Sequence, residues 1–195
     1  MRKISDKKIE ERKNRLWRYN NLILSEIVPQ CELATEECRE TPGRSANAML
    51  ELLKGYQPPD FKFTTFPTNY KGMLVRAPIP FTSVCAHHVL PYTGHAYVGI
   101  IYNKKKLGIS KIIRAVQYWA ARLTSQEELT QFMVEQFDKI IKPKGVIVVL
   151  KAFHLCEGIR GVKVPNVETT TSWYVGVFEK DSTRNEFYSL IGGKQ

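Results

Sequence analysis

The order of hydrophobic and polar residues predicts helices at the start of the chain. From about residue 7 to residue 28, apolar residues recur at helical spacing until Pro29 ends the pattern. A second helix is expected near Thr41, which can cap it, with Pro42 in its first turn and Gly55 at its end. Residues 57–70 carry prolines without a regular period, which predicts a loop with short extended pieces.

The rest of the chain alternates between the periods of strands and helices. Two helices are expected in the middle of this part, the first capped by Ser110 and the second starting at Gln126 and Glu127. Strands are expected near residues 73–77, 95–102, 145–156 and 169–178. This order predicts an α+β domain in which helices cover one face of an antiparallel sheet. We therefore divide the chain into an N-terminal helical region, residues 1–56, and a larger domain, residues 57–195.

The amino-acid composition limits the class of protein and its cellular compartment. An apolar fraction of 43% in 195 residues is ordinary for a globular protein, and no apolar run is long enough to cross a bilayer. The charged N-terminal segment lacks the apolar core of a secretory signal, so we expect a cytoplasmic protein. In that compartment the four cysteines are expected to be free thiols or metal ligands rather than disulfides.

The net charge of +10 favours an anionic partner. Much of the charge lies in the first eighteen residues and in the NKKK turn, where a solvated helix and a hairpin tip account for most of it. No nucleic-acid motif accompanies it. We therefore expect a phosphorylated small molecule, and neither nucleic acid nor a membrane, as the partner.

Two short motifs combine cysteine and histidine. Cys85 and His88 have C-x-x-H spacing, and His154 and Cys156 have H-x-C spacing at the end of an apolar segment. Zinc accepts thiolate and imidazole ligands, and catalytic zinc sites use three protein ligands with one open position. On a strand, His154 and Cys156 would share a face, whereas Cys85 and His88 can meet only if the chain bends. With Cys85, His88 and Cys156 on a metal, His87 and His154 would be free for proton transfer.

Two simpler alternatives remain open for these residues. The cysteines can be small core residues and the histidines satisfied polar groups, since buried free cysteine is common. Alternatively, the metal site can be closed and structural, with His87 or His154 as its fourth ligand. A nucleobase deaminase is disfavoured, because the H-x-E and P-C-x-x-C signatures of zinc deaminases are absent.

A second group of residues suits a purine nucleotide. Lys111 and Arg114 lie three positions apart at a predicted helix start, where a phosphate would be attracted by the helix dipole and both cations. Arg160 follows Cys156 at a turn, and its guanidinium suits phosphate oxygens. The carboxylate of Glu127 can accept two hydrogen bonds from the N1–H and 2-amino edge of guanine. Taken alone, Lys111 and Arg114 are compatible with an exposed amphipathic helix, and Glu127 would more often be a helix N-terminal acid than a guanine-binding residue.

Together these motifs resemble the zinc-dependent GTP cyclohydrolase I family. The resemblance runs from about Thr41 to Ile191 and rests on TPGRSANAM, TSVCAHHVLP, LGISKIIR, QEELT, FHLCEGIRG, TTTSWYVGVF and RNEFYSLI. It implies the tunnelling fold, an antiparallel four-stranded sheet with two helices on one face, plus N-terminal helices. It also implies a homodecamer with active sites between subunits, which converts GTP and water to 7,8-dihydroneopterin triphosphate and formate.

The resemblance also implies a role for each site residue. Cys85, His88 and Cys156 correspond to the ligands of Zn²⁺, and His87 and His154 to the residues that transfer protons. Substrate contacts are implied for Arg44, Ser110, Lys111, Arg114, Gln126, Glu127 and Arg160, of which Gln126 and Glu127 would hold the guanine edge.

The chain departs from the family pattern at three positions. Ala86 stands where the family usually has glutamate, Glu128 where it has arginine, and Asn47 where it often has lysine. Ala86 can neither accept a hydrogen bond nor carry charge. An alternative expectation is therefore a member with weakened or lost catalysis that acts as a nucleotide-binding or regulatory protein.

Overall fold

The computed structural model describes residues 6–192, which fall into two compact units divided between Pro58 and Pro59. Residues 1–5 of the predicted N-terminal region lie outside the described residues. The first unit contains α1 (Asp6–Ile27), α2 (Gln30–Leu33), α3 (Thr41–Leu52) and the 3-10 helix η1 (Lys54–Tyr56). No helix of the described part is long and apolar enough to cross a membrane.

In the first unit, α1 packs against α3. The Ser45 hydroxyl donates to the side-chain oxygen of Asn20, and Gly43 lies against the ring of Trp17. Thr41 is the first residue of α3 and not its cap, because Glu40 occupies the N-cap position and Pro42 the first turn. Much of the apolar side of α1 stays exposed, including Leu22 and Ile23.

The second unit is built on a five-stranded sheet in the order β5-β2-β3-β6-β7. Its four long strands are antiparallel neighbours, and β5 (Leu123–Thr124) adds a two-residue parallel edge beside β2. The long strands are β2 (Met73–Cys85), β3 (Pro91–Ile101), β6 (Gly145–His154) and β7 (Glu168–Gly176). A separate pair joins β1 (Thr65–Pro67) to β4 (Lys105–Leu107). The predicted α+β class is confirmed, and the sequence did not indicate β5.

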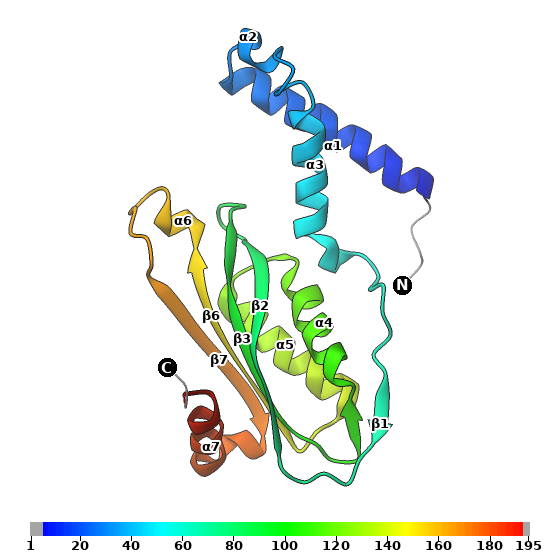
Figure 1. Cartoon of the computed structure of the whole chain (residues 1–195), viewed down its shortest axis with the longest axis vertical. Coiled ribbons are helices and arrows are strands. Elements are labelled where there is room, and N and C mark those ends of the chain that lie inside the picture. Colours follow the sequence, from blue (N-terminus) through cyan, green and yellow to red (C-terminus); the bar gives the residue numbers. More distant parts are fainter. Residues whose placement is uncertain (1–5, 193–195) are drawn as a thin grey trace. The chain divides into compact units, whose positions relative to one another are not determined.

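Two helices cover one face of this sheet, α4 (Ile109–Ala120) and α5 (Gln126–Ile141), as Figure 1 shows. Strand β6 alternates between the two faces: Val146 and Val148 join the core under these helices, whereas Ile147 and Val149 point to the other side. Because both faces are covered, β6 reads as a continuous apolar run.

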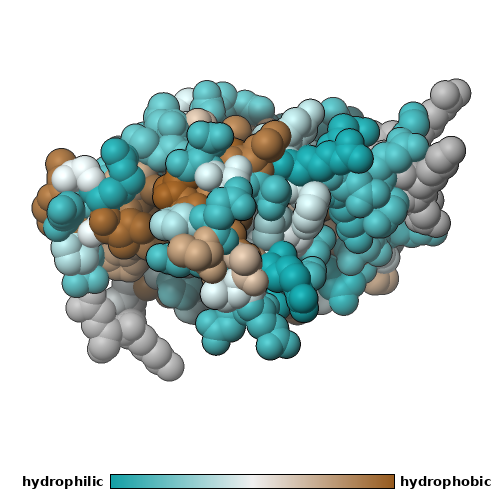
Figure 2. Space-filling model, turned by 90° about the horizontal axis from the view of Figure 1, so that it is seen from above, coloured by the Kyte–Doolittle hydropathy of each residue, from teal (hydrophilic) through white to brown (hydrophobic). Residues whose placement is uncertain are grey.

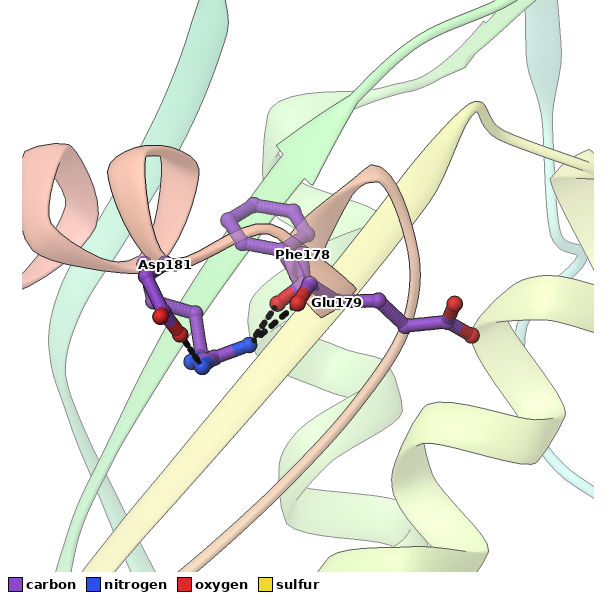
Figure 3. Close-up of polar contacts among 4 residues, drawn as sticks. Phe178, Glu179 and Asp181 are labelled. Carbon is purple, nitrogen blue, oxygen red and sulfur yellow. Dashed lines mark hydrogen bonds and ion pairs between the residues drawn. The ribbon is translucent and has the colours of Figure 1, made fainter.

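The opposite face is closed by the 3-10 helix η2 (Val177–Glu179) and by α7 (Asp181–Gly192), whose Phe187 is fully buried. Arg184 holds the start of α7 in place. Its guanidinium donates to the carbonyl oxygens of Phe178 and Glu179 and pairs with Asp181 (Figure 3). Figure 2 shows that hydrophobic residues still reach the surface between hydrophilic ones on the face it presents.

Strand β2 is longer than predicted, and β3 begins earlier. The prediction ended the first strand near residue 77, and prolines follow at positions 78 and 80. Strand β2 instead continues to Cys85, with a register shift between Arg76 and Ile79. On its outer side, β2 pairs with β5 only at Val84 and Cys85, so its prolines lie where no neighbouring strand needs their N–H groups. This continuation carries the chain directly into the predicted metal site.

Candidate active site

A tight turn between β2 and β3 brings a cysteine and two histidines together. The Cys85 N–H donates to the Leu90 carbonyl at 2.9 Å, and the Val89 N–H donates to the Cys85 carbonyl at 3.0 Å. Val89 adopts a positive φ of 55°, which reverses the chain within residues 86–90. As a result, the Nδ1 atoms of His87 and His88 lie 3.9 Å and 3.8 Å from the Cys85 sulfur.

The second cysteine reaches this turn from the end of β6. Strand β6 ends at His154, and Cys156 lies in the single-turn helix α6 (Leu155–Gly158). The expectation that His154 and Cys156 share the face of one strand is therefore wrong, because the chain leaves the sheet between them. The Cys156 sulfur lies 3.9 Å from that of Cys85.

The ligand atoms of Cys85, His88 and Cys156 all lie within 4.8 Å of one another. Tetrahedral zinc with Zn–S bonds of about 2.3 Å holds two sulfurs about 3.8 Å apart, so the observed spacing of the thiols fits such an ion. Both cysteines are buried, whereas His88 is exposed. Burial raises the pKa of the Cys156 thiol, and the neighbouring Cys85 raises it further. A cation bound between the two sulfurs would oppose this rise, because it favours the thiolate form. The donor set is therefore suited to a soft metal such as zinc.

His154 stands next to the cysteines with its ring held from two sides. Its Nε2 atom lies 2.9 Å from Oε1 of Gln126, and its ring stacks on that of Tyr92 at 4.4 Å between centroids and 5° between planes. Tyr92 and His154 are direct partners in the β3–β6 register. Burial lowers the pKa of His154, and the charges of Glu157 and Glu127 partly oppose this shift. Burial therefore favours the neutral form of the ring, which is the form that can accept a proton.

Helix α5 begins beside His154 and places two acidic groups at its start. Ser125 caps the helix, since its hydroxyl accepts from the Glu128 N–H at 3.2 Å. Glu127 and Glu128 are exposed in the first turn, and Glu128 accepts from the Thr124 hydroxyl at 3.4 Å. A guanine-binding role for Glu127 stays a prediction.

Gln126 differs from its two acidic neighbours, because only 1% of its surface is exposed. The two N–H groups of its amide are shared among three acceptors, which are the carbonyl oxygens of Leu150 and Thr169 and the Thr171 hydroxyl, at 3.1, 2.9 and 3.1 Å from the amide nitrogen. A side chain with these partners must give some of them up to reach a nucleotide. Its predicted place at the guanine edge remains untested.

The residues predicted to bind triphosphate come from three separate parts of the chain. Helix α4 starts at Ile109 after Gly108, so Ser110 lies in its first turn and is not its cap. Lys111 and Arg114 follow on the same helix, and the Lys111 ammonium lies 5.7 Å from the Phe61 ring centroid. Arg160 is exposed just after α6. Arg44 lies on α3 in the other unit, where its guanidinium donates to the Glu37 carbonyl. All of these phosphate contacts stay predictions.

Sequence reasoning missed Tyr92, which stacks on His154, and Thr130, which supports Gln126. The Thr130 hydroxyl donates to the main-chain carbonyl oxygen of Gln126 and lies 2.7 Å from the Thr171 hydroxyl. Neither contact leaves a signal in the sequence beyond a helical i, i+4 spacing for Thr130. Both depend on how β3, β6 and β7 align, which no local pattern specifies.

Comparison with known proteins identifies the family. The model of the GTP cyclohydrolase I family matches residues 22–192. The chain is 43% identical to GTP cyclohydrolase 1 of Porphyromonas gingivalis over 159 residues, covering 80% of this chain and 82% of that protein. It is 36% identical to the Saccharomyces cerevisiae protein of the same name, covering 94% of this chain and 77% of the relative. For the Gloeobacter violaceus protein the identity is 41%, over 79% and 74% of the two chains.

Among solved structures, the apo archaeosine synthase QueF-Like is similar over 54% of this chain and 92% of its own, with a TM-score of 0.43 and 20% identity. This distant likeness bears on neither substrate nor chemistry. The family match covers most of the chain, and the matched segment contains the Cys85, His88 and Cys156 group with both neighbouring histidines. This chain belongs to the GTP cyclohydrolase I family.

Proposed function

We propose that this chain is a zinc-dependent GTP cyclohydrolase I, which hydrolyses GTP at C8 of the purine. One observation carries the proposal: a three-ligand group of Cys85, His88 and Cys156 lies beside two histidines, His87 and His154, that it does not require. Three ligands leave one tetrahedral position for water, whereas a closed structural site would use a fourth side chain.

A zinc ion bound by these residues would supply Lewis-acid activation of the water that attacks C8. His87, exposed on the turn, is placed to give a proton to the imidazole ring nitrogen as that ring opens. His154, neutral and held by Gln126 and Tyr92, is placed to accept protons in the later steps. Formate leaves with C8, and rearrangement and closure of the ribose carbons give 7,8-dihydroneopterin triphosphate. The net reaction consumes one water.

Both acidic and basic residues are proposed to bind the substrate. The Glu127 carboxylate would accept the N1–H and 2-amino hydrogens of guanine, which adenine does not offer. The cationic side chains of Arg44, Lys111, Arg114 and Arg160, with the Ser110 hydroxyl, would bind the triphosphate. The net charge of +10 supports attraction of such an anion.

We further propose a homodecamer with active sites between subunits. Apolar side chains such as Trp173 on β7 remain exposed in the single chain, and within residues 6–192 β7 has a partner strand on one side only. Ten copies of the 22.4 kDa chain would give a particle of about 224 kDa by light scattering. The four cysteines are free, which supports a reducing compartment such as the cytoplasm.

The proposed activity is tested with the full chain loaded with zinc and supplied with GTP. We expect formate and, after oxidation, a fluorescent pterin in equal amounts, and neither product with ATP. Zinc-loaded protein that binds GTP and releases no formate would overturn the proposal.

Ala86 favours a second candidate function, a nucleotide-binding member with little catalysis. It is exposed in the turn between Cys85 and His87, where a carboxylate could reach metal or substrate. Because this turn is exposed, Ala86→Glu should fold normally. Turnover rising from near zero to an easily measured rate in that variant would favour the second function. Active wild-type protein would exclude it.

A further inference from the structure

Gln126 occupies the centre of a small polar network between α5, β6 and β7. Its amide nitrogen faces the carbonyl oxygens of Leu150 and Thr169, and its amide oxygen faces Nε2 of His154 at 2.9 Å. Polar groups this deeply buried are stable only when their hydrogen bonds are made. Gln126 therefore has strict requirements for the partner on each side of its amide.

These requirements determine the direction in which the NH₂ group and the oxygen of the Gln126 side chain point. Carbonyl oxygens only accept hydrogen bonds, so the NH₂ group must face Leu150 and Thr169. The remaining amide atom is an oxygen, which also only accepts. His154 must then donate from Nε2, and in the neutral ring the lone pair falls on Nδ1. The tautomer of His154 follows from the position of two backbone carbonyls.

The surrounding contacts hold this arrangement in place. Within α5, the Thr130 hydroxyl donates to the main-chain carbonyl oxygen of Gln126, and it also contacts the Thr171 hydroxyl on β7. The Thr171 hydroxyl in turn accepts from the side-chain amide of Gln126. On the other side, Tyr92 lies parallel to the His154 ring and blocks its rotation. The Tyr92 hydroxyl is in turn anchored to the Thr124 carbonyl, at 3.5 Å.

We propose that Gln126 is a positioning residue that fixes His154 as its Nε2–H tautomer, so that Nδ1 is the atom that exchanges protons with the substrate. The proton on Nε2 stays on the ring throughout, hydrogen-bonded to the Gln126 amide oxygen, and each proton that His154 accepts at Nδ1 later leaves from Nδ1. This inference rests on the proposed function, because that function assigns proton transfer to His154. It replaces direct contact with guanine as the role of the Gln126 side chain.

The two roles of Gln126 predict different kinetics. A side chain that binds guanine contributes to substrate affinity, so its loss raises KM. A side chain that orients a proton-transfer group contributes to the chemical step, so its loss lowers kcat. Displacing a reacting group by about 1 Å can cost about 100-fold in rate.

The test compares Gln126→Met with Gln131→Met as its matched control, both as full-length, zinc-loaded protein. Gln126→Met keeps the side-chain length and removes the amide, so His154 loses the hydrogen-bond acceptor at its Nε2 atom. Gln131→Met makes the same change at an exposed position of α5, where the Gln131 side chain contacts Glu135. We expect kcat to fall about 100-fold in Gln126→Met with little change in KM for GTP, and to stay near wild type in Gln131→Met. A rise in KM at unchanged kcat would overturn the proposal.

A spectroscopic measurement on the unmodified chain keeps the test independent of folding and activity. Long-range proton–nitrogen correlation spectra of ¹⁵N-histidine-labelled protein distinguish the two imidazole tautomers, and the His154 signals are assigned by their absence in His154→Asn. We expect the Nε2–H tautomer in the wild type and in Gln131→Met. An Nδ1–H tautomer in the wild type would contradict the proposal. If instead the Nε2–H tautomer is found but no formate is released from GTP, the proposed function fails and the positioning of His154 stands.

Discussion

The sulfur atoms of Cys85 and Cys156 lie 3.9 Å apart, although 71 positions separate them in the chain. One sulfur is delivered by the end of β2 and the other by the short helix after β6. Strand β3 lies between β2 and β6 and pairs with both, so its two registers set this distance. The metal site is thus a product of the sheet rather than of a local loop.

Zinc binding is predicted to require both of these cysteines. Cys85→Ser and Cys156→Ser should each lose stoichiometric zinc, because the two remaining ligand residues no longer form a three-ligand site. Cys31→Ser is the matched control, since Cys31 is a free, exposed cysteine on α2. Metal content by mass spectrometry of purified protein checks this. Full zinc in Cys156→Ser would show that the site is elsewhere.

Removal of the metal is predicted to lower thermal stability. A ligand that binds only the folded state stabilises it by about 2.7 kcal/mol at one hundred times its Kd. Chelation should therefore lower the Tm of the wild type, and added zinc should restore it, whereas the Tm of Cys85→Ser should respond to neither. Calorimetry with and without chelator measures both. A chelator-insensitive wild type would argue that Cys85 and Cys156 are simply core residues.

His87 and His88 are predicted to differ despite being neighbours. His88→Ala should lose zinc, whereas His87→Ala should retain it and lose turnover by about 100- to 10,000-fold, the range for a general acid. His95→Ala, which alters an exposed histidine on β3, should keep both zinc and activity. Metal content and formate release are measured on the same preparations. If His87→Ala loses zinc and His88→Ala keeps it, the two roles are reversed.

Gly94 is predicted to be essential for the close pairing of β3 and β6 near Tyr92 and His154. A Cβ atom at this position would collide with the carbonyl oxygen of Lys151 and the Cα of Ala152. Gly94→Ala should therefore lower the free energy of unfolding by about 1–3 kcal/mol, as overpacking does. At Gly192 a Cβ would meet no described atom within 4 Å, so Gly192→Ala is the control. Equal denaturation midpoints for the two variants would contradict the described register.

Stability is predicted to decline at alkaline pH through Tyr102. Burial raises the pKa of Tyr102 from 10.0 to about 12. Between these values the unfolded chain releases the phenol proton and the folded chain keeps it, so the contribution is full below pH 10 and is lost as pH rises to 12. The slope attributable to this group is about 1.4 kcal/mol per pH unit. Unfolding in urea at several pH values should give a shallower decline for Tyr102→Phe, and an unchanged slope would refute the assignment.

Much of the helical part of the fold could be predicted from the sequence, because its signals are local. The apolar positions of the two central helices, such as Ile112 and Val116 in α4 and Leu129 and Met133 in α5, are buried as expected. The strands were harder to delimit. Strand β2 continues through prolines at positions 78 and 80, since a proline ends a strand only where a neighbouring strand needs its N–H group. That information lies in the sheet order and not in the segment.

The same division holds at the site. Spacing and residue type alone indicated Cys85, His88 and Cys156, which the structure brings together. The contact between Gln126 and His154 could not be predicted from the sequence, because it arises where the start of α5 meets the end of β6. The local sequence QEEL does not indicate that Gln126 is buried and that its neighbour Glu127 is exposed. Only the fold separates Gln126, which holds a protein group, from Glu127, which is free to meet a ligand.

The central claim is that this chain releases C8 of GTP as formate. The most direct measurement follows GTP labelled with ¹³C at C8 by carbon NMR, in the presence of full-length zinc-loaded protein. The account predicts that the label appears in formate, with one 7,8-dihydroneopterin triphosphate formed for each GTP consumed, and that Cys156→Ser produces neither. Label that remains in intact GTP, with zinc bound at Cys85, His88 and Cys156, would contradict it.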